Sequence, residues 1–178
     1  MHDAEHLTVS FALPDEAATL ACAARLASAP CLAPGMGIWL EGELGAGKTT
    51  LVRGLLRALG ETGPVKSPTY TLVEVHVVSG LHLYHFDFYR LNHPDEYLDA
   101  GLDDYFSGNA AGNAVYLVEW PDKAAPYLPP ADLRIEFRVV DTPDKPGAQQ
   151  REIICHAHST RGAACLTAAM SSATPPPA

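Results

Sequence analysis

Residues 42–49 read GELGAGKT, which matches the phosphate-binding pattern G-x-x-x-x-G-K-[ST] at every fixed position. An apolar run over residues 36–40 precedes this loop, and a stretch with helical periodicity over 48–59 follows it. This order of strand, loop and helix is the context in which the pattern binds phosphate, because glycines let the backbone turn its N–H groups inward and the helix start presents its positive dipole end. The sequence therefore predicts an α/β domain of the P-loop NTPase class that binds a nucleotide.

The side chains of this loop indicate how the nucleotide is held. Lys48 supplies a positive charge for the β- and γ-phosphates and is a predicted catalytic residue, while the Thr49 hydroxyl is a ligand for Mg²⁺. ATP is the expected nucleotide, because the tetrapeptide Asn-Lys-x-Asp of guanine-binding enzymes does not occur in the chain. The loop residues predicted to contact the nucleotide are Gly45, Ala46, Gly47, Lys48, Thr49 and Thr50.

Hydrophobic patterning predicts the architecture around the loop. Residues 71–78 and 81–88 are both rich in β-forming residues and are joined by Ser79-Gly80, which predicts an antiparallel hairpin. A hairpin within an α/β chain implies a mixed sheet, so we expect the three-layer P-loop NTPase fold with a mixed, largely parallel central sheet. The other expected elements are strands over 7–13, 36–40, 114–118, 133–140 and 151–157, and helices over 14–28, 48–59 and 94–100.

We predict one folded domain followed by a tail. The chain of 178 residues is long enough for a single hydrophobic core, and we assign residues 1–158 to a P-loop ATPase domain. Its first helix is expected to start at Pro14, since proline suits the first helical position. Residues 159–178 consist mainly of Ala, Ser, Thr and Pro. Such a segment buries little apolar surface, so we predict a flexible tail.

Composition restricts the class of partner and the compartment. The formal net charge is −9, from 12 basic and 21 acidic residues, which disfavours direct binding to a nucleic-acid backbone. No segment has the length and apolarity of a membrane span, and the acidic start of the chain does not resemble a signal peptide. The cysteines show neither a C-x-x-C pair nor zinc-site spacing, which indicates reduced, packed thiols in a cytoplasmic protein. They are Cys22, Cys31, Cys155 and Cys165.

Glu119 is the first candidate acid for the chemistry. It follows the apolar run Val115-Tyr116-Leu117-Val118, which is the form of a Walker-B strand with Glu in place of the commoner Asp. A parallel sheet would bring this strand end close to the magnesium site. The alternative is a Glu that caps a helix or is solvated.

Asp87 is the second candidate acid. It lies among aromatic residues, and a buried carboxylate in such surroundings needs a cation, an activated water or a hydrogen-bonding partner. A structural ion pair with Arg90 explains the sequence equally well. Between the loop helix and the hairpin, Ser67 and Thr69 are candidate switch residues that sense the γ-phosphate, although Ser67-Pro68 also suits an ordinary turn.

Two histidines precede Asp87 on the same predicted strand. His82 and His85 are three residues apart, and positions with this spacing on a strand point to opposite faces of the sheet. The pattern therefore disfavours a metal ion shared by both histidines.

Four segments together resemble one protein family. They are GELGAGKTT at 42–50, KSPTYTLV at 66–73, HFDFYR at 85–90 and LVEWP at 117–121. In this order they look like the bacterial TsaE (YjeE) ATPases, which take part in making threonylcarbamoyladenosine at position 37 of tRNA. The resemblance covers roughly residues 7–157, and the last three segments are far more specific than the P-loop.

The resemblance implies a Mg²⁺-dependent ATPase that works with two partner proteins, TsaB and TsaD, and meets tRNA only through that complex. By position, Thr49 and Glu119 would hold Mg²⁺, and Asp87 would be a metal ligand or position the attacking water. Trp120 would be a functional aromatic residue beside Glu119. Two further positions match family residues near the nucleotide: Glu16 and Arg151.

Two other functions fit a P-loop chain of this size. A small-molecule kinase would need an acceptor pocket and a lid carrying several arginines, and no such run follows Glu119. A nucleotide-gated scaffold would bind ATP with little turnover. Phosphate release without an acceptor distinguishes the ATPase from both.

Overall fold

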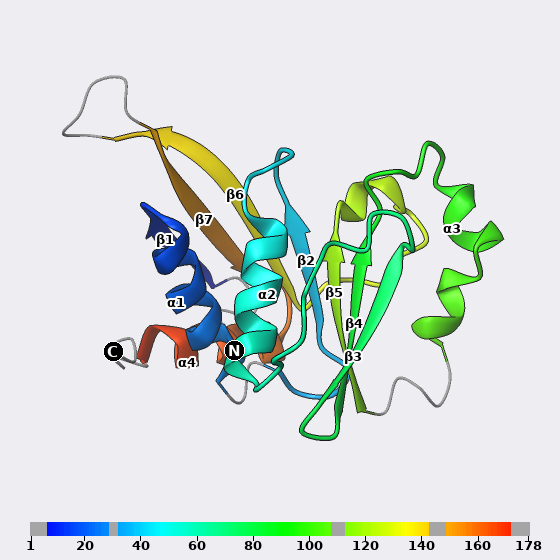
Figure 1. Cartoon of the computed structure of the whole chain (residues 1–178), viewed down its shortest axis with the longest axis horizontal. Coiled ribbons are helices and arrows are strands. Elements are labelled where there is room, and N and C mark those ends of the chain that lie inside the picture. The colour runs from blue at the N-terminus through cyan, green and yellow to red at the C-terminus, as the bar shows by residue number, and fades with distance from the viewer. Residues whose placement is uncertain (1–6, 29–31, 108–112, 143–148, 172–178) are drawn as a thin grey trace.

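The computed structural model describes residues 7–28, 32–107, 113–142 and 149–171 (Figure 1). These residues form one seven-stranded sheet in the order β1-β7-β6-β2-β5-β4-β3. The strands are β1 (Thr8–Leu13), β2 (Gly37–Glu41), β3 (Val73–Val78), β4 (Leu81–Asp87), β5 (Ala114–Glu119), β6 (Leu133–Asp141) and β7 (Gln149–Ala157). The helices are α1 (Glu16–Ala27), α2 (Lys48–Ala58), α3 (Asp95–Asp99) and α4 (Thr160–Ser171), with 3₁₀ turns η2 (Leu102–Tyr105) and η4 (Pro121–Lys123).

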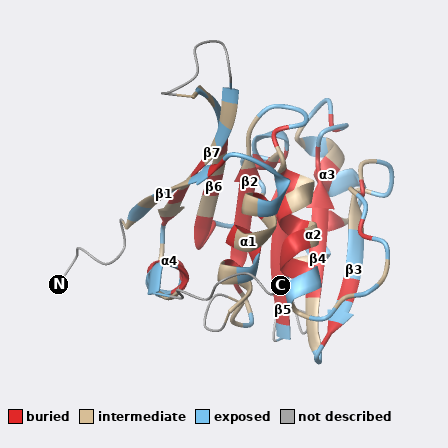
Figure 2. Cartoon of the chain, turned by 60° about the vertical axis from the view of Figure 1, so that its left-hand side comes forward, coloured by how far each residue is buried: buried red, intermediate tan, exposed pale blue. Residues whose placement is uncertain are grey.

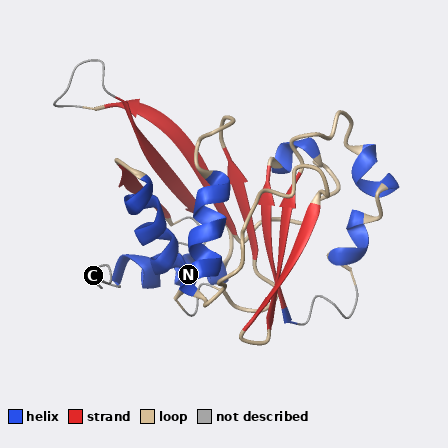
Figure 3. Cartoon of the chain, viewed as in Figure 1, coloured by secondary structure: helices blue, strands red, loops and turns tan. Residues whose placement is uncertain are grey.

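The sheet has a parallel centre and antiparallel edges. Strands β6, β2, β5 and β4 run parallel to one another, whereas β3 pairs antiparallel with β4, and β7 pairs antiparallel with both β6 and β1. Figure 3 shows this single sheet with helices beside it. The predicted mixed α/β sheet, including its hairpin, is therefore confirmed. In this register Leu40 and Asp87 both lie opposite Glu119, so the carboxyl ends of three parallel strands meet.

One face of the sheet packs against α1, α2 and α4. Helices α1 and α2 lie side by side, and the buried residues between them and the strands are mainly aliphatic. Because side chains alternate along a strand, the odd-numbered residues of β5, Val115 and Leu117, belong to this cluster, as do Leu51 and Leu55 of α2. Figure 2 shows the resulting buried centre of the sheet and the more exposed edge strand β3.

The opposite face carries an aromatic cluster. Here the alternate residues of the same strands, such as Tyr84 and Tyr116, pack with Tyr97 of α3 and with Phe106 after η2. The ring centroids of Phe106 and Tyr116 are 4.6 Å apart in a stacked pair. Such pairs add to the hydrophobic gain of burial. This layer has only short helices, so aromatic side chains provide most of its thickness.

Helix α1 begins later than expected. Pro14 precedes the helix, and Asp15 is the N-cap, with its side chain accepting a hydrogen bond from the backbone N–H of Ala18 at 2.8 Å. An aspartate oxygen satisfies a free N–H of the first turn, which proline cannot do.

The prediction of a flexible tail from residue 159 is wrong for residues 160–171. They form α4, which contacts α1 and β7 and buries Cys165 and Leu166. Its small residues allow a close approach: a Cβ on Gly162 would lie 2.0 Å from the carbonyl oxygen of Asp132. The composition of the segment does not indicate a packed helix, because alanine and glycine each bury little area. They nevertheless allow the whole helix to pack closely. The remaining predicted tail, 172–178, lies outside the described residues.

Asp132 fastens the start of α4 to the sheet. Its carboxylate accepts hydrogen bonds from the Gly37 backbone N–H at 3.0 Å and from the Ser159 hydroxyl at 2.5 Å. It also pairs with Arg161 at 3.2 Å. Cys22, Cys155 and Cys165 are buried, as expected of packed thiols; Cys31 lies outside the described residues, and the reduced state of the cysteines stays a prediction.

Candidate active site

The P-loop connects β2 to α2 and has the backbone that its glycines predict. Gly42, Gly45 and Gly47 have positive φ values of 141°, 77° and 112°. Gly42 is required for space as well, because a Cβ there would lie 2.8 Å from Cβ of Phe137 and 2.9 Å from its carbonyl oxygen. Gly47 caps α2 without a side-chain hydrogen bond, which leaves the N–H groups of the first turn facing the loop.

Lys48 lies inside the loop and is 4% exposed. Its Nζ donates to the carbonyl oxygens of Gly42 at 2.6 Å and Glu43 at 2.8 Å, and it lies 4.2 Å from the ring centroid of Trp120. Burial lowers the pKa of Lys48 from its ordinary value, while the nearby carboxylates of Glu119, Asp87 and Glu43 oppose that shift. A partly desolvated ammonium of this kind interacts strongly with an anion.

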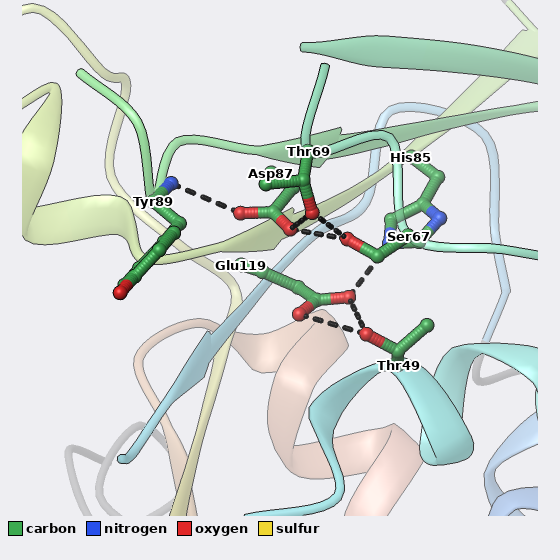
Figure 4. A network of polar contacts seen from close by, with 7 residues as sticks. All are labelled: Thr49, Ser67, Thr69, His85, Asp87, Tyr89 and Glu119. Atoms are coloured by element: carbon green, nitrogen blue, oxygen red, sulfur yellow. Dashed lines mark hydrogen bonds and ion pairs between the residues drawn. The ribbon is translucent and has the colours of Figure 1, made fainter. Parts of the chain in front are cut away.

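Glu119 is buried in a polar network at the end of β5. It is 3% exposed, and its Oε1 accepts hydrogen bonds from the Thr49 hydroxyl at 2.8 Å and contacts Nε2 of His85 at 2.9 Å. Oε2 has one contact with Thr49, at 3.1 Å. Figure 4 shows these side chains converging from α2, β4 and β5. The alternative of a solvated or helix-capping Glu119 does not describe this geometry.

Asp87 occupies the matching position at the end of β4. Its carboxylate, 4% exposed, accepts hydrogen bonds from the hydroxyls of Ser67 and Thr69, the latter at 2.9 Å, and from the Tyr89 backbone N–H at 2.9 Å. Arg90 does not form the alternative ion pair, since its guanidinium lies over the Tyr70 ring, 4.0 Å from the centroid. Asp87 is therefore held by neutral donors.

The two candidate switch residues bind the same carboxylate. The hydroxyls of Ser67 and Thr69 are 2.8 Å apart, and both donate to Oδ2 of Asp87 (Figure 4). The segment that carries them is thus attached to the strand end through Asp87. A change in the contacts of Asp87 would be transmitted to this segment.

Trp120 turns the chain away from the sheet directly after Glu119. Its backbone has φ 58°, and its ring lies 5.2 Å from that of Tyr89, between centroids. This conformation places the indole over Lys48 and beside the strand ends.

A cavity of about 270 Å³ lies where these groups meet. Of its charged lining residues, one is basic, Lys48, and two are acidic, Asp87 and Glu119. The structure therefore brings together the residues that were predicted from four separated segments. The full lining is Leu44, Gly45, Ala46, Gly47, Lys48, Thr49, Thr50, Ser67, Thr69, Asp87, Tyr89, Glu119 and Trp120.

Two residues assigned through the resemblance are outside this lining. Glu16, in the first turn of α1, pairs with Arg53 of α2 at 2.9 Å. Arg151 of β7 borders the loop, with its guanidinium 3.4 Å from the carbonyl oxygen of Gly45. Contacts of Glu16 and Arg151 with a nucleotide stay predictions.

His85 is the member of the network that the sequence patterns missed. It is fully buried and contacts Glu119, although only its metal-binding capacity was considered from the sequence. The signal that could have found it is its spacing: His85 lies two residues before Asp87 on one strand, so both face the same side of the sheet.

The donor atoms suit magnesium if a nucleotide completes the site. Thr49, Glu119 and Asp87 offer only oxygen, as hard divalent cations prefer. Among the described residues, no group of three or more His, Cys, Asp or Glu side chains could hold a metal ion alone. In the usual P-loop arrangement, Mg²⁺ takes one or two protein ligands, phosphate oxygens and waters. In the same described part of the chain, no helix is long and apolar enough to cross a membrane.

Known proteins are similar to this chain over most of its length. The family profile described as threonylcarbamoyl adenosine biosynthesis protein TsaE matches residues 13–152. A curated relative from Haemophilus influenzae, tRNA threonylcarbamoyladenosine biosynthesis protein TsaE, is 46% identical over 104 residues, which are 58% of this chain and 63% of that protein. The match therefore spans less than two thirds of the Haemophilus protein.

Bacillus subtilis supplies a second relative and a solved structure. Its tRNA threonylcarbamoyladenosine biosynthesis protein TsaE is 42% identical over 120 residues, or 67% of this chain and 68% of that protein. The crystal structure of Bacillus subtilis YdiB matches this chain with a TM-score of 0.69 and 30% sequence identity. The match covers 93% of this chain and 95% of the YdiB chain. The chain belongs to the TsaE family of threonylcarbamoyl adenosine biosynthesis proteins.

Proposed function

We propose that this TsaE-family protein is the ATPase subunit of the machinery that modifies tRNA with threonylcarbamoyladenosine at position 37. In this role it binds ATP with Mg²⁺, hydrolyses it to ADP and phosphate, and so supports turnover of a complex of TsaB and TsaD homologues. One observation carries the proposal: the P-loop and two buried strand-end carboxylates line the same cavity. The proposed compartment is the cytoplasm, which suits the free, buried thiols of Cys22 and Cys155.

The loop and its first helical turn would hold the phosphates. In the nucleotide complex we expect Lys48 to exchange its contacts with the carbonyls of Gly42 and Glu43 for phosphate oxygens. The N–H groups of the loop and of α2 would bind the same anion. Thr49 and Glu119, which now contact each other, would hold Mg²⁺. Held by these residues, the ion would neutralise charge that develops on the transferring phosphoryl group.

Asp87 is suited to orient the attacking water. Its Oδ2 is bound by the Ser67 and Thr69 hydroxyls, whereas Oδ1 receives only the Tyr89 N–H among the described residues. A carboxylate held in this way has an oxygen available for a water or for the metal shell. Ser67 and Thr69 would then report the state of the nucleotide, because any movement of Asp87 alters their hydrogen bonds. Trp120 would cover Lys48 and the phosphates.

Partner proteins are expected to control the rate. Phosphoryl transfer depends on positioned positive charge, and an arginine finger contributes about 10³–10⁵ in rate. Lys48 is the only basic residue in the cavity lining that the structure describes, and Arg90 is engaged with Tyr70. The acidic chain also disfavours direct contact with tRNA. We therefore propose slow hydrolysis by the isolated protein and a marked change with TsaB and TsaD homologues.

The two arginines of β6 argue against a small-molecule kinase. Arg134 pairs with Glu41 through two donors, and Arg138 pairs with Glu136 at 2.7 Å. Both belong to β6, and each is paired with a glutamate, Arg134 with one on β2 and Arg138 with one on β6. They do not form the basic lid that would screen the phosphates in a kinase.

A coupled phosphate assay tests the proposal. ATP and Mg²⁺ are supplied to the protein alone, then with the TsaB and TsaD homologues, and separately with tRNA. We expect slow phosphate release alone, a marked change with the two proteins and little change with tRNA by itself. Fast turnover that ignores both proteins, or a phosphorylated small acceptor, would favour a kinase. Tight ATP binding with no phosphate release under any condition would favour a scaffold.

A further inference from the structure

His85 is a fully buried histidine that the proposed chemistry does not use. It lies on β4 between Leu83 and Asp87, on the face that packs toward α2, and its Nε2 is 2.9 Å from Oε1 of Glu119. Leu83, two residues earlier on the same face, belongs to the aliphatic cluster. Burying a polar ring costs free energy unless the ring is hydrogen-bonded.

The contacts of the ring indicate where its proton lies. Nδ1 of His85 is buried and has no hydrogen-bonding partner among the described residues, so nothing there accepts a proton from it. The Glu119 carboxylate beside Nε2 is an acceptor. In this contact Nε2 is the donor and Oε1 of Glu119 the acceptor, which requires a proton on Nε2.

This donation makes the two oxygens of Glu119 unequal. Oε1 accepts from both His85 and Thr49, at 2.9 and 2.8 Å. Oε2 has a single and longer contact, 3.1 Å from the Thr49 hydroxyl. If the Thr49 hydroxyl binds a cation, it no longer donates to Glu119. Oε2 then has no partner among the described residues, whereas Oε1 still contacts His85.

We propose that His85 is a positioning residue that holds Oε1 of Glu119 and presents Oε2 to the divalent cation. This inference rests on the proposed function only in taking Glu119 as a cation ligand. Partners that hold a ligand in this way commonly account for 10- to 100-fold in metal affinity. His85 itself touches neither nucleotide nor metal in this arrangement.

The first test uses the protein without nucleotide. Long-range ¹H–¹⁵N spectra of the histidine rings report which nitrogen carries the proton. We expect the Nε2–H form for His85, and a changed Nε2–H signal in Glu119→Gln, because the charged acceptor is lost. A proton on Nδ1, or a His85 signal indifferent to Glu119→Gln, would overturn the proposal.

The second test measures metal binding without turnover. Mn²⁺ is titrated into the ADP complex and followed by electron paramagnetic resonance. We expect His85→Leu to weaken Mn²⁺ binding by about 10- to 100-fold and His85→Gln to restore most of that loss, because the Gln side-chain amide carries an N–H donor. The matched control is His76→Leu, since His76 of β3 is also buried, 8% exposed, and lies 3.7 Å from a carboxylate, that of Glu61.

Each outcome separates the inference from the function on which it rests. If Glu119→Gln binds Mn²⁺ as tightly as the wild type, Glu119 is no ligand and the proposed metal site fails. If Glu119→Gln weakens binding while His85→Leu does not, only the role of His85 fails. Equal losses in folded His85→Leu and His85→Gln proteins would indicate a packing role and overturn the proposal. His85→Gln keeps the test valid should His85→Leu not fold.

Discussion

The two faces of the central sheet use the same strands but different side chains. Toward α1 and α2, β4 and β5 present aliphatic residues such as Leu83 and then, at their carboxyl ends, the acids Asp87 and Glu119. Toward α3 the same strands present mainly aromatic residues, as at Phe86 and Tyr116. Alternation along each strand keeps the two sets apart although they are neighbours in sequence.

The aromatic face serves packing, whereas the face toward α1 and α2 also carries the candidate catalytic acids. Aromatic rings can fill the layer on the aromatic face, because no side chain there has to contact a ligand. On the helix face the buried acids require partners, and they have them in Thr49, Ser67, Thr69 and His85. Substitutions on the aromatic face should therefore change the stability of the fold. Substitutions of the buried acids at the strand ends should change activity.

The largest effect is expected from Lys48→Ala on the helix face. The substitution removes the one basic side chain of the described cavity lining, so hydrolysis should fall below detection and ATP affinity should drop more than ADP affinity. Isothermal calorimetry with both nucleotides measures this. Equal ATP affinity for mutant and wild type would contradict the assignment of the loop.

Tyr97→Ala should have the next largest effect, on stability alone. Tyr97 is fully buried on the aromatic face, with its ring 5.7 Å from that of Phe88, between centroids. Truncating a ring of this size in a core costs about 3–5 kcal/mol. Urea unfolding measures the loss, while nucleotide affinity of the folded fraction should stay at the wild-type level. A selective loss of nucleotide binding would show that the two faces are coupled.

Glu119→Gln and Asp87→Asn should give the opposite pattern. Each isostere keeps the volume but removes a charge, so turnover should fall by about a hundredfold or more, equivalent to roughly 2–4 kcal/mol in the transition state. The unfolding midpoint in urea serves as the control and should move little. Normal turnover in Glu119→Gln would mean that β5 ends in a structural residue only.

The smallest effect is expected from Tyr97→Phe, the matched control for Tyr97→Ala. Burial raises the pKa of Tyr97 to about 12, so the phenol stays neutral at ordinary pH, and its hydroxyl has no hydrogen-bonding partner among the described residues. Removing an unpartnered buried hydroxyl should leave the free energy of unfolding unchanged or raise it by about 1 kcal/mol. A loss greater than 1 kcal/mol in urea unfolding would reveal a hydrogen bond to this group.

Several features could be predicted from the sequence because their causes are local. The loop pattern around Lys48 specifies its own backbone through Gly42, Gly45 and Gly47. Strand and helix periods likewise lie within windows of about ten residues. The hairpin of β3 and β4 follows from Ser79-Gly80, and the acids could be identified at strand ends. The resemblance of four ordered segments to the TsaE family needed no structure.

Local patterns failed where the outcome depended on distant contacts. The segment 160–171 looks unable to bury enough surface, yet Asp132, some thirty residues earlier in the chain, anchors the start of α4 through Ser159 and Arg161. Pairing of Asp87 with nearby Arg90 was equally plausible from the sequence. The fold instead supplies hydroxyls from Ser67 and Thr69, which lie 20 and 18 residues away.

The sequence by itself determined the phosphate loop, the order of the elements from β1 to β7, the family and the acids at the ends of β4 and β5. Only the tertiary structure decided which oxygen of Glu119 contacts His85, because the two residues lie 34 positions apart on different strands. The physical reason is that backbone conformation depends mainly on neighbouring residues, whereas the surroundings of a buried charge depend on strand order and register. Parallel pairing of β4 with β5 sets Asp87 opposite Glu119, and that pairing creates the site.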